Sequence, residues 1–275
     1  MIQNILIPVE VSSGSEAAIE LGLRWARRTG AAVTGLGIVD EPTIGKPDPC
    51  ASGAGKIYRQ QELIADARVR VNRLLDKFAK QCHGAAVRFA TRKEVGVPSE
   101  RIIAAAEDFD LTLLGHRSNF HFETQTHPDE TLEEVLRDSR RPVAAVADIL
   151  PVNQTVVVAY DGSPTSVRAL ETFQKSNLDV WQKVRVVSVG RDEVEARRHA
   201  EEGARFLRFF DIPAEPRALV ASENVANLLI REVHDLDAGM LVMGAFGRSQ
   251  AAESLFGSTT LRVLETADTL LFLHH

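Results

Sequence analysis

The chain has 275 residues, of which 44% are hydrophobic and 25% are charged, and its formal net charge is -6. This length is long for a single domain and suits two domains, each able to bury a hydrophobic core. Lysine and arginine are interspersed with acidic residues, so the sequence offers no basic face for nucleic acid, and any anion site must be built locally.

The cysteines Cys50 and Cys82 form no CxxC motif, which argues against a disulfide framework and favours a reducing compartment. Residues 1–9 lack the basic and apolar regions of a signal peptide and are predicted to contain a strand. No apolar stretch reaches the length needed to span a bilayer. We therefore expect a cytoplasmic protein with neither a membrane nor a nucleic acid as its partner.

The first half begins with a short β-branched run, residues 5–9, which ends at Glu10 and leads through a Ser/Gly turn into a helical pattern. Ser15 is a candidate N-cap of this helix. A second apolar run covers residues 32–39. The stretch from Glu41 to Gln61 is rich in proline and glycine, has no apolar periodicity, and is predicted to be a loop.

A long amphipathic helix follows the predicted loop. Its apolar stripe consists of Leu63, Ala67, Val71, Leu74, Leu75 and Phe78. Apolar runs at residues 111–115 and 142–146 predict the fourth strand and the closing strand of this half. Continuous apolar runs, rather than alternating ones, are typical of strands that are covered on both faces.

The second half repeats this pattern of elements. Residues 156–160 lead to Asp161, and Ser163-Pro164 supplies an N-cap followed by a helix-opening proline. The later strands of this half are predicted from apolar runs at residues 184–189, 217–220, 240–244 and 269–273. The first half contains an insertion that the second half lacks, and we place it in the predicted loop after the second strand.

Alternation of strands and helices predicts a doubly wound parallel sheet, in which ligands bind at the carboxyl ends of the strands near the switch point. We predict two tandem α/β domains, residues 1–149 and 152–275, related by a pseudo-twofold axis. Each is expected to be a five-stranded parallel sheet flanked by helices, with the first and fourth strands flanking the switch point.

A glycine pattern, G-x2-G-x9-G-[ST], begins where the fourth strand of the second half ends and contains Gly244, Gly247 and Gly257. Glycines let a backbone pass close to a bulky anion and adopt positive φ angles where a phosphate loop requires them. Gly257 precedes a predicted helix, whose free N–H groups and dipole would face phosphate oxygens. Further groups for a phosphate are the side chains of Arg248, Ser258 and Thr259.

This pattern resembles the nucleotide loop of the ATP-binding branch of the universal stress protein family. That family also has a strand-ending aspartate before a Gly/Ser turn, here Asp161-Gly162-Ser163. The resemblance covers nearly the whole chain, weakly in the first half and strongly in the second. It implies a Rossmann-like fold and an adenine nucleotide, ATP or ADP/AMP, with Mg²⁺ held mainly by phosphates and water.

The resemblance also implies roles for individual residues. Asp161 and the backbone at Val189 would meet the adenine edge, Met243 would line the adenine slot, and Gly244 would lie near the ribose. The complete implied nucleotide site consists of Ala159, Asp161, Gly162, Ser163, Val189, Met243, Gly244, Gly247, Arg248, Gly257, Ser258 and Thr259.

The first half departs from the glycine pattern. After Gly115, Ser118 stands at the second glycine position, Pro128-Asp129 stands near the third, and Glu10-Val11 replaces the Asp-Gly pair. Acidic residues bring negative charge to the place of the phosphates, and the proline removes a donor N–H. We interpret this site as degenerate. The nearby His116, His121, Glu123 and His127 lack the tight spacing of metal ligands, so we expect solvated loop residues and no metal.

We expect a stress-response protein that binds ATP in its C-terminal domain and acts as a nucleotide-dependent regulator. The glycine loop contains Arg248, Ser249 and Glu253 but no apparent general base, so we predict no catalytic residue and at most slow hydrolysis. The alternative is a nucleotide-free tandem scaffold that binds a partner protein. An adenylating or ATP-pyrophosphatase enzyme would need a Ser-Gly-Gly-type loop, which neither residues 10–15 nor residues 161–165 provide.

The two closing strands, residues 142–147 and 269–273, are apolar at consecutive positions. A long, exposed apolar edge invites aggregation, so we expect these strands to cover each other. This would pair the two domains within one chain, and a homodimer of chains can form in addition.

Overall fold

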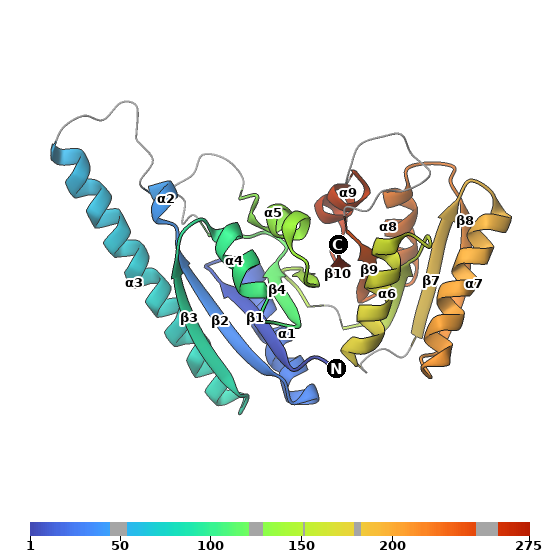
Figure 1. The fold of residues 1–275 in the computed structure, drawn as a ribbon, viewed down its shortest axis with the longest axis horizontal. Coiled ribbons are helices and arrows are strands. Elements are labelled where there is room, and N and C mark those ends of the chain that lie inside the picture. The colour runs from blue at the N-terminus through green and yellow to red at the C-terminus, as the bar shows by residue number, and fades with distance from the viewer. Residues whose placement is uncertain (45–53, 121–128, 151, 179–182, 246–257) are drawn as a thin grey trace. The chain divides into compact units, whose positions relative to one another are not determined.

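The computed structural model describes residues 1–44, 54–120, 129–150, 152–178, 183–245 and 258–275. The chain divides into two compact units, one formed by Gln3–Val135 and the other by Met1–Ile2 together with Leu136–His275. In each unit, helices flank a sheet whose strands are mainly parallel (Figure 1). The predicted fold class, a tandem pair of doubly wound α/β repeats, is confirmed.

The unit Gln3–Val135 has the strand order β3-β2-β1-β4, and the neighbouring strands run parallel. Its elements are β1 (Asn4–Val9), α1 (Ser13–Thr29), β2 (Ala32–Val39), α2 (Glu41–Ile44), α3 (Ala54–Gly84), β3 (Phe89–Val95), α4 (Pro98–Ala106), β4 (Leu111–Gly115) and α5 (Thr131–Asp138), which crosses the boundary between the units. Together with β5 (Val143–Val146), these elements are called the first repeat.

The other unit has the strand order β5-β10-β9-β6-β7-β8. The elements after β5, called the second repeat, are β6 (Thr155–Ala159), α6 (Pro164–Ser176), β7 (Lys183–Gly190), α7 (Glu193–Phe209), β8 (Ala214–Val220), α8 (Val225–Asp235), β9 (Met240–Gly244), α9 (Ser258–Thr266) and β10 (Leu270–His274). Strands β10, β9, β6, β7 and β8 are all parallel, as the sequence predicts.

The central strands are buried on both faces. Ile5, Leu6 and Ile7 follow one another in β1 with no exposed surface, and so do Val156 and Val157 in β6. Successive side chains of a strand point to opposite faces, so consecutive burial requires helices on both sides. In the second repeat, α7 packs on β7 and β8, α6 packs on β9 and β10, and α8 packs against α9.

Two helix starts can be compared with their predicted caps. Ser163 is the N-cap of α6, where its side chain accepts a hydrogen bond from the Ser166 N–H, and Pro164 opens the helix, as predicted. The predicted cap of α1 was wrong. Ser12, not Ser15, is the N-cap and accepts from the Ser15 N–H. Ser15 lies inside the first turn of the helix. Its hydroxyl accepts a hydrogen bond from the Glu10 N–H.

The prediction of a loop from Glu41 to Gln61 was also wrong for residues 41–44 and 54–61, the parts of this range that the structure describes. Residues 41–44 form α2, and α3 already begins at Ala54, where good helix formers follow in sequence. The predicted apolar stripe of α3 holds for Ala67, Val71, Leu75 and Phe78, which are buried. Leu63 is 41% exposed and Leu74 is half-buried, so the prediction is wrong for Leu63.

The closing strands of the two repeats pair with each other, as predicted. β5 and β10 are antiparallel neighbours within the same compact unit, with Leu271 opposite Ala145 and Leu273 opposite Val143. All four residues of β5 are buried. The apolar edge of β10 is therefore covered by a strand from the first repeat.

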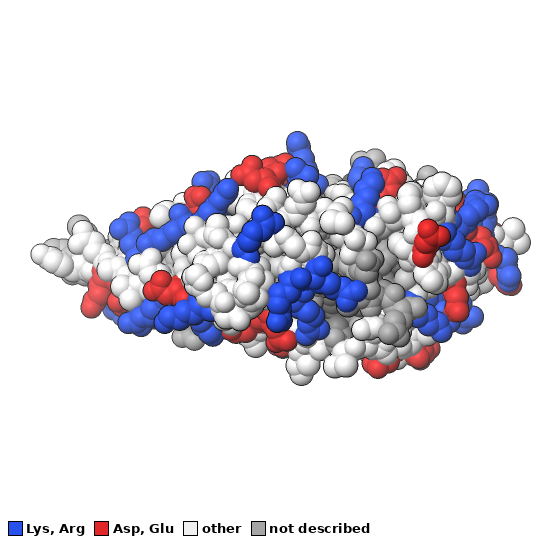
Figure 2. Space-filling view, turned by 90° about the horizontal axis from the view of Figure 1, so that it is seen from below, with Lys and Arg blue, Asp and Glu red and all other residues white. Residues whose placement is uncertain are grey.

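None of the described helices is both long and apolar enough to cross a membrane. Acidic and basic side chains are mixed over most of the face drawn in Figure 2, with one larger group of basic side chains. The strands at the far ends of the two strand orders, β3 and β8, carry exposed charged residues such as Arg92 and Glu215. Charges at a sheet edge disfavour pairing with another strand.

Candidate functional site

The carboxyl ends of three strands meet at one edge of the sheet in the second repeat. β6 lies between β9 and β7, with Val158 opposite Val242 and Ala159 opposite Val187. Since all three strands are parallel, Asp161, Val189 and Gly244 come to the same edge. This is the switch point of a doubly wound sheet, where such folds bind ligands.

The turn after β6 presents a carboxylate to solvent. Asp161 is exposed, and its Oδ1 accepts a hydrogen bond of 2.9 Å from the Ser163 N–H. Gly162 has φ +74°, a left-handed conformation that favours glycine. The Ser163 hydroxyl lies 3.2 Å from the Thr165 hydroxyl and also caps α6. The predicted Asp-Gly-Ser turn therefore exists and holds its aspartate at the sheet edge.

Gly244 ends β9 where the first turn of α6 crosses it. A Cβ at this position would lie 2.7 Å from the Thr165 carbonyl carbon and 2.8 Å from the Ser166 nitrogen. Gly115 ends β4 in the same way, and its Cβ would lie 2.8 Å from the Gly14 carbonyl carbon. Close backbone approach therefore accounts for the first glycine in both repeats, including the one whose loop is degenerate.

The remaining predicted residues fall into three groups. Ala159, Val189 and Thr259 are half-buried, and Met243 is 5% exposed at the end of β9. α9 begins at Ser258, earlier than the sequence predicts, since the helix was expected from Leu261; Ser258 and Thr259 therefore lie in its first turn rather than before it. Gly247, Arg248 and Gly257 lie outside the described residues.

A third element, α7, packs behind this turn. Tyr160 is 6% exposed, and its burial, with the negative charges of Glu202 and Asp161, raises its pKa to about 12. Its ring makes an edge contact with the ring of His199 on α7. His199 was not predicted from the sequence, since no sequence motif marks a histidine in mid-helix as a neighbour of the turn.

The first repeat buries its corresponding carboxylate. Glu10 is 2% exposed, and its Oε2 accepts a hydrogen bond of 2.6 Å from the Ser12 N–H, while its Oε1 accepts one from the Ser12 hydroxyl. Burial and the nearby Asp129 charge raise the pKa of Glu10, against the opposing effect of the Ser12 hydrogen bonds. The Glu10 carboxylate is thus turned into the protein, whereas that of Asp161 is open to solvent.

The start of α5 in the first repeat is bonded to a side chain of the chain itself. Asp129 Oδ1 accepts a hydrogen bond of 2.9 Å from the Thr131 N–H, and Oδ2 accepts one of 2.6 Å from the Phe120 N–H. One carboxylate therefore joins the loop after β4 to the helix start. His116 is half-buried beside this loop, whereas His121, Glu123 and His127 lie outside the described residues.

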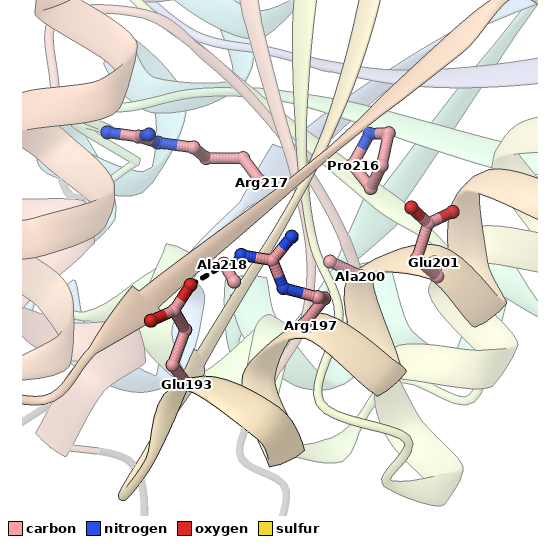
Figure 3. Close-up of a pocket in the computed structure, with 7 residues that line it drawn as sticks. All are labelled: Glu193, Arg197, Ala200, Glu201, Pro216, Arg217 and Ala218. Atoms are coloured by element: carbon pink, nitrogen blue, oxygen red, sulfur yellow. Dashed lines mark hydrogen bonds and ion pairs between the residues drawn. The ribbon is translucent and has the colours of Figure 1, made fainter.

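A pocket of about 240 Å³ lies between α7 and β8, away from the predicted nucleotide residues (Figure 3). Its charged lining residues have ionic partners. Arg197 pairs with Glu193, Arg217 with Glu232 at 3.2 Å, and Glu201 with Arg208 at 3.8 Å. Each of these charged residues therefore already has an ionic partner in the protein, and the switch point of the second repeat remains the better candidate site.

Comparison with known proteins agrees with the repeat structure. The sequence model of the Universal stress protein family matches residues 1–147 and again residues 153–271. The Universal stress protein Slr1230 of Synechocystis sp. is 28% identical over 159 residues, covering 57% of this chain and 55% of that protein. The chain thus spans about half the length of this curated relative.

Solved structures share the fold over the full length. A universal stress protein from Archaeoglobus fulgidus DSM 4304 superposes with a TM-score of 0.72 at 18% identity, covering 98% of this chain and 95% of that chain. A putative universal stress protein from Pseudomonas aeruginosa UCBPP-PA14 gives a TM-score of 0.64 at 17% identity, covering 99% and 93%. At these identities the likeness shows the fold alone.

Proposed function

This chain belongs to the universal stress protein family as two tandem copies, and from that premise we propose that its second repeat binds ATP or a related adenine nucleotide. The proposal rests on one observation. The carboxyl ends of β9, β6 and β7 lie at one edge of the sheet, and the exposed Asp161 carboxylate follows β6 there. A ligand can reach this carboxylate without displacing part of the core.

The start of α9 supports the proposal that this site binds the phosphates of the nucleotide. The helix begins directly after Gly257, and its first N–H groups and dipole favour an anion. Thr259 supplies a hydroxyl in the first turn. Gly247 and Arg248 are proposed as further phosphate ligands, and Mg²⁺ would be held mainly by phosphate oxygens and water.

The first repeat is proposed to hold no nucleotide. Its strand-end carboxylate, Glu10, is buried and bonded to Ser12. The N–H of Thr131 at the start of its helix is bonded to Asp129. A phosphate would have to displace one carboxylate and approach another, which like-charge repulsion opposes. One nucleotide per chain is therefore the expected stoichiometry.

We propose that the protein is a cytoplasmic regulator whose output depends on nucleotide occupancy. Catalytic turnover is not part of the proposal beyond slow hydrolysis. The direct test is the nucleotide content of the purified protein, released by heat and identified by absorbance and mass. Adenine nucleotide approaching one per chain is the expected result. Protein that is free of nucleotide and does not bind added ATP would favour the nucleotide-free scaffold instead.

A further inference from the structure

His199 on α7 stands directly against Gly162, the residue that follows Asp161. A Cβ built on Gly162 would lie 2.7 Å from both Cε1 and Nδ1 of His199. A real Cβ does not approach another atom so closely, so the imidazole ring fills the space that any other residue would need. Glycine is thus favoured at this position by its positive φ angle, and any added Cβ would force the His199 ring to shift.

The His199 ring is held by groups on three sides. Its edge meets the Tyr160 ring with 6.5 Å between centroids, and its Nε2 lies 3.2 Å from Nη2 of Arg198. A guanidinium can only donate, so Nε2 is the acceptor in this contact. Nδ1 is buried without a hydrogen-bond partner, and the nearest Glu202 carboxylate oxygen lies 3.7 Å from it. The Tyr160 contact and the Nε2 hydrogen bond therefore orient the ring.

Small residues on α7 allow this close packing. Ala196, Ala200, Gly203 and Ala204 are all buried on the face toward the sheet. A Cβ on Gly203 would lie 3.2 Å from the Tyr160 ring and 3.0 Å from Val186. The helix can therefore bring His199 up to the turn between β6 and α6, and the side chain remains 18% exposed there.

We propose that His199 is a positioning residue, which holds the Asp161-Gly162-Ser163 turn so that the Asp161 carboxylate is ready to receive an adenine nucleotide. This inference rests on the proposed function of the second repeat. A glycine turn in a left-handed conformation has many alternative states when it is unsupported. A ring packed against it removes those states before binding, and preorganisation of this kind raises affinity.

The corresponding turn of the first repeat has similar hydrogen bonds but no glycine at its centre. Ser12 donates to Glu10, whose own N–H donates to the Ser15 hydroxyl. In the second repeat the Ser163 N–H donates to Asp161, whose own N–H donates to Ser166 Oγ at 3.4 Å. The two turns differ at the position of Gly162, where the first repeat has Val11, which is 51% exposed. The solvent-facing carboxylate and the supporting histidine thus occur together in the second repeat.

Calorimetric titration with ATP tests the proposal in the full-length chain. His199→Ala should weaken binding by about 10-fold, the scale on which loss of preorganisation acts. His199→Phe, which keeps a flat ring, should bind within about threefold of wild type. The matched control is His234→Ala, an exposed histidine on α8 outside the site, which should bind as wild type does.

Wild-type affinity in His199→Ala would overturn the inference but leave the proposed function intact. If His199→Phe binds as weakly as His199→Ala, the imidazole itself acts on the nucleotide and the positioning role is wrong. If wild type and His234→Ala both fail to bind ATP, the proposed function fails and this inference fails with it.

A double-mutant cycle with Gly162→Ala distinguishes a local contact from general damage to the fold. Gly162→Ala alone should weaken ATP binding, because its Cβ overlaps the ring. In the His199→Ala background the same change should have a clearly smaller effect, since contacting residues are not additive. Thermal unfolding of the four proteins should show the same coupling without nucleotide. Purely additive effects in both measurements would overturn the proposed contact.

Discussion

The Asp129 carboxylate accepts a hydrogen bond of 2.6 Å from the backbone N–H of Phe120. Its other oxygen accepts from the Thr131 N–H at 2.9 Å, at the first residue of α5. One side chain of the first repeat therefore joins the loop after β4 to the start of the helix that follows it.

Asp129→Ala is expected to destabilise the first repeat by about 1–2 kcal/mol, because it leaves two backbone donors without their acceptor. The free energy of unfolding from urea denaturation measures this loss. Glu130→Ala, a change at the exposed neighbouring residue, is the matched control and should lie close to wild type. Equal stability of the two variants would contradict a bridging role for Asp129.

Glu10→Gln tests the buried carboxylate through the pH dependence of stability. Burial and the Asp129 charge raise the pKa of Glu10 above its ordinary value of 4.5. A raised pKa in the folded state means that wild type loses stability as the pH rises from this value through the folded pKa.

The Glu10→Gln variant has no such titration, so its stability relative to wild type should increase between about pH 5 and about pH 8. Unfolding free energies of both proteins at the two pH values give the comparison, in which contributions from all other groups cancel. A constant difference between the proteins would mean that the Glu10 pKa is not raised in the folded protein.

The strand-end glycines should be intolerant of even one added carbon in either repeat. Gly244→Ala would push a methyl group into the backbone of α6 at Thr165, and Gly115→Ala would do so into α1 at Gly14. Overpacking of this kind costs about 1–3 kcal/mol. Denaturation of both variants should show comparable losses, whereas Gly84→Ala, where a Cβ would meet nothing within 4 Å, should not. Wild-type stability of Gly244→Ala would show that the close approach is not required.

The sequence predicts much of the fold, because its strongest patterns are those that the sheet requires. Consecutive apolar residues in β1 and β6 indicated strands covered on both faces, and their burial agrees. The pairing of β5 with β10 was predictable from their apolar edges. The start of α3 was not, because a proline- and glycine-rich composition obscured the helix-forming residues from Ala54 onward.

The candidate site was predictable to the extent that it depends on strand order. Parallel strands in the order β9-β6-β7 place Asp161, Gly244 and Val189 at one edge without reference to side-chain packing. His199 was not predictable, because its contact with Gly162 depends on how closely α7 approaches the sheet. Asp129 was recognised as a negative charge, but its bonds depend on a loop conformation that no periodicity encodes.

The pairing of β5 with β10 predicts the behaviour of fragments. A fragment of residues 152–275 lacks β5 and would expose the apolar edge of β10, so it should self-associate. The full-length chain, in which β5 covers this edge, should self-associate less at the same concentration. Light scattering after size exclusion distinguishes the two. A stable, monodisperse monomer of residues 152–275 would show that β10 needs no partner strand.

The central claim is that the chain binds one adenine nucleotide, in its second repeat, and calorimetric titration with ATP tests it most directly. The predicted result is a single site per chain in wild type. Gly257→Val should bind at least about 10-fold more weakly, because a β-branched side chain in a phosphate loop costs about 1–3 kcal/mol in strain and crowding. Circular dichroism of the variant must match wild type. Two equivalent sites per chain, or Gly257→Val binding as tightly as wild type, would contradict the claim.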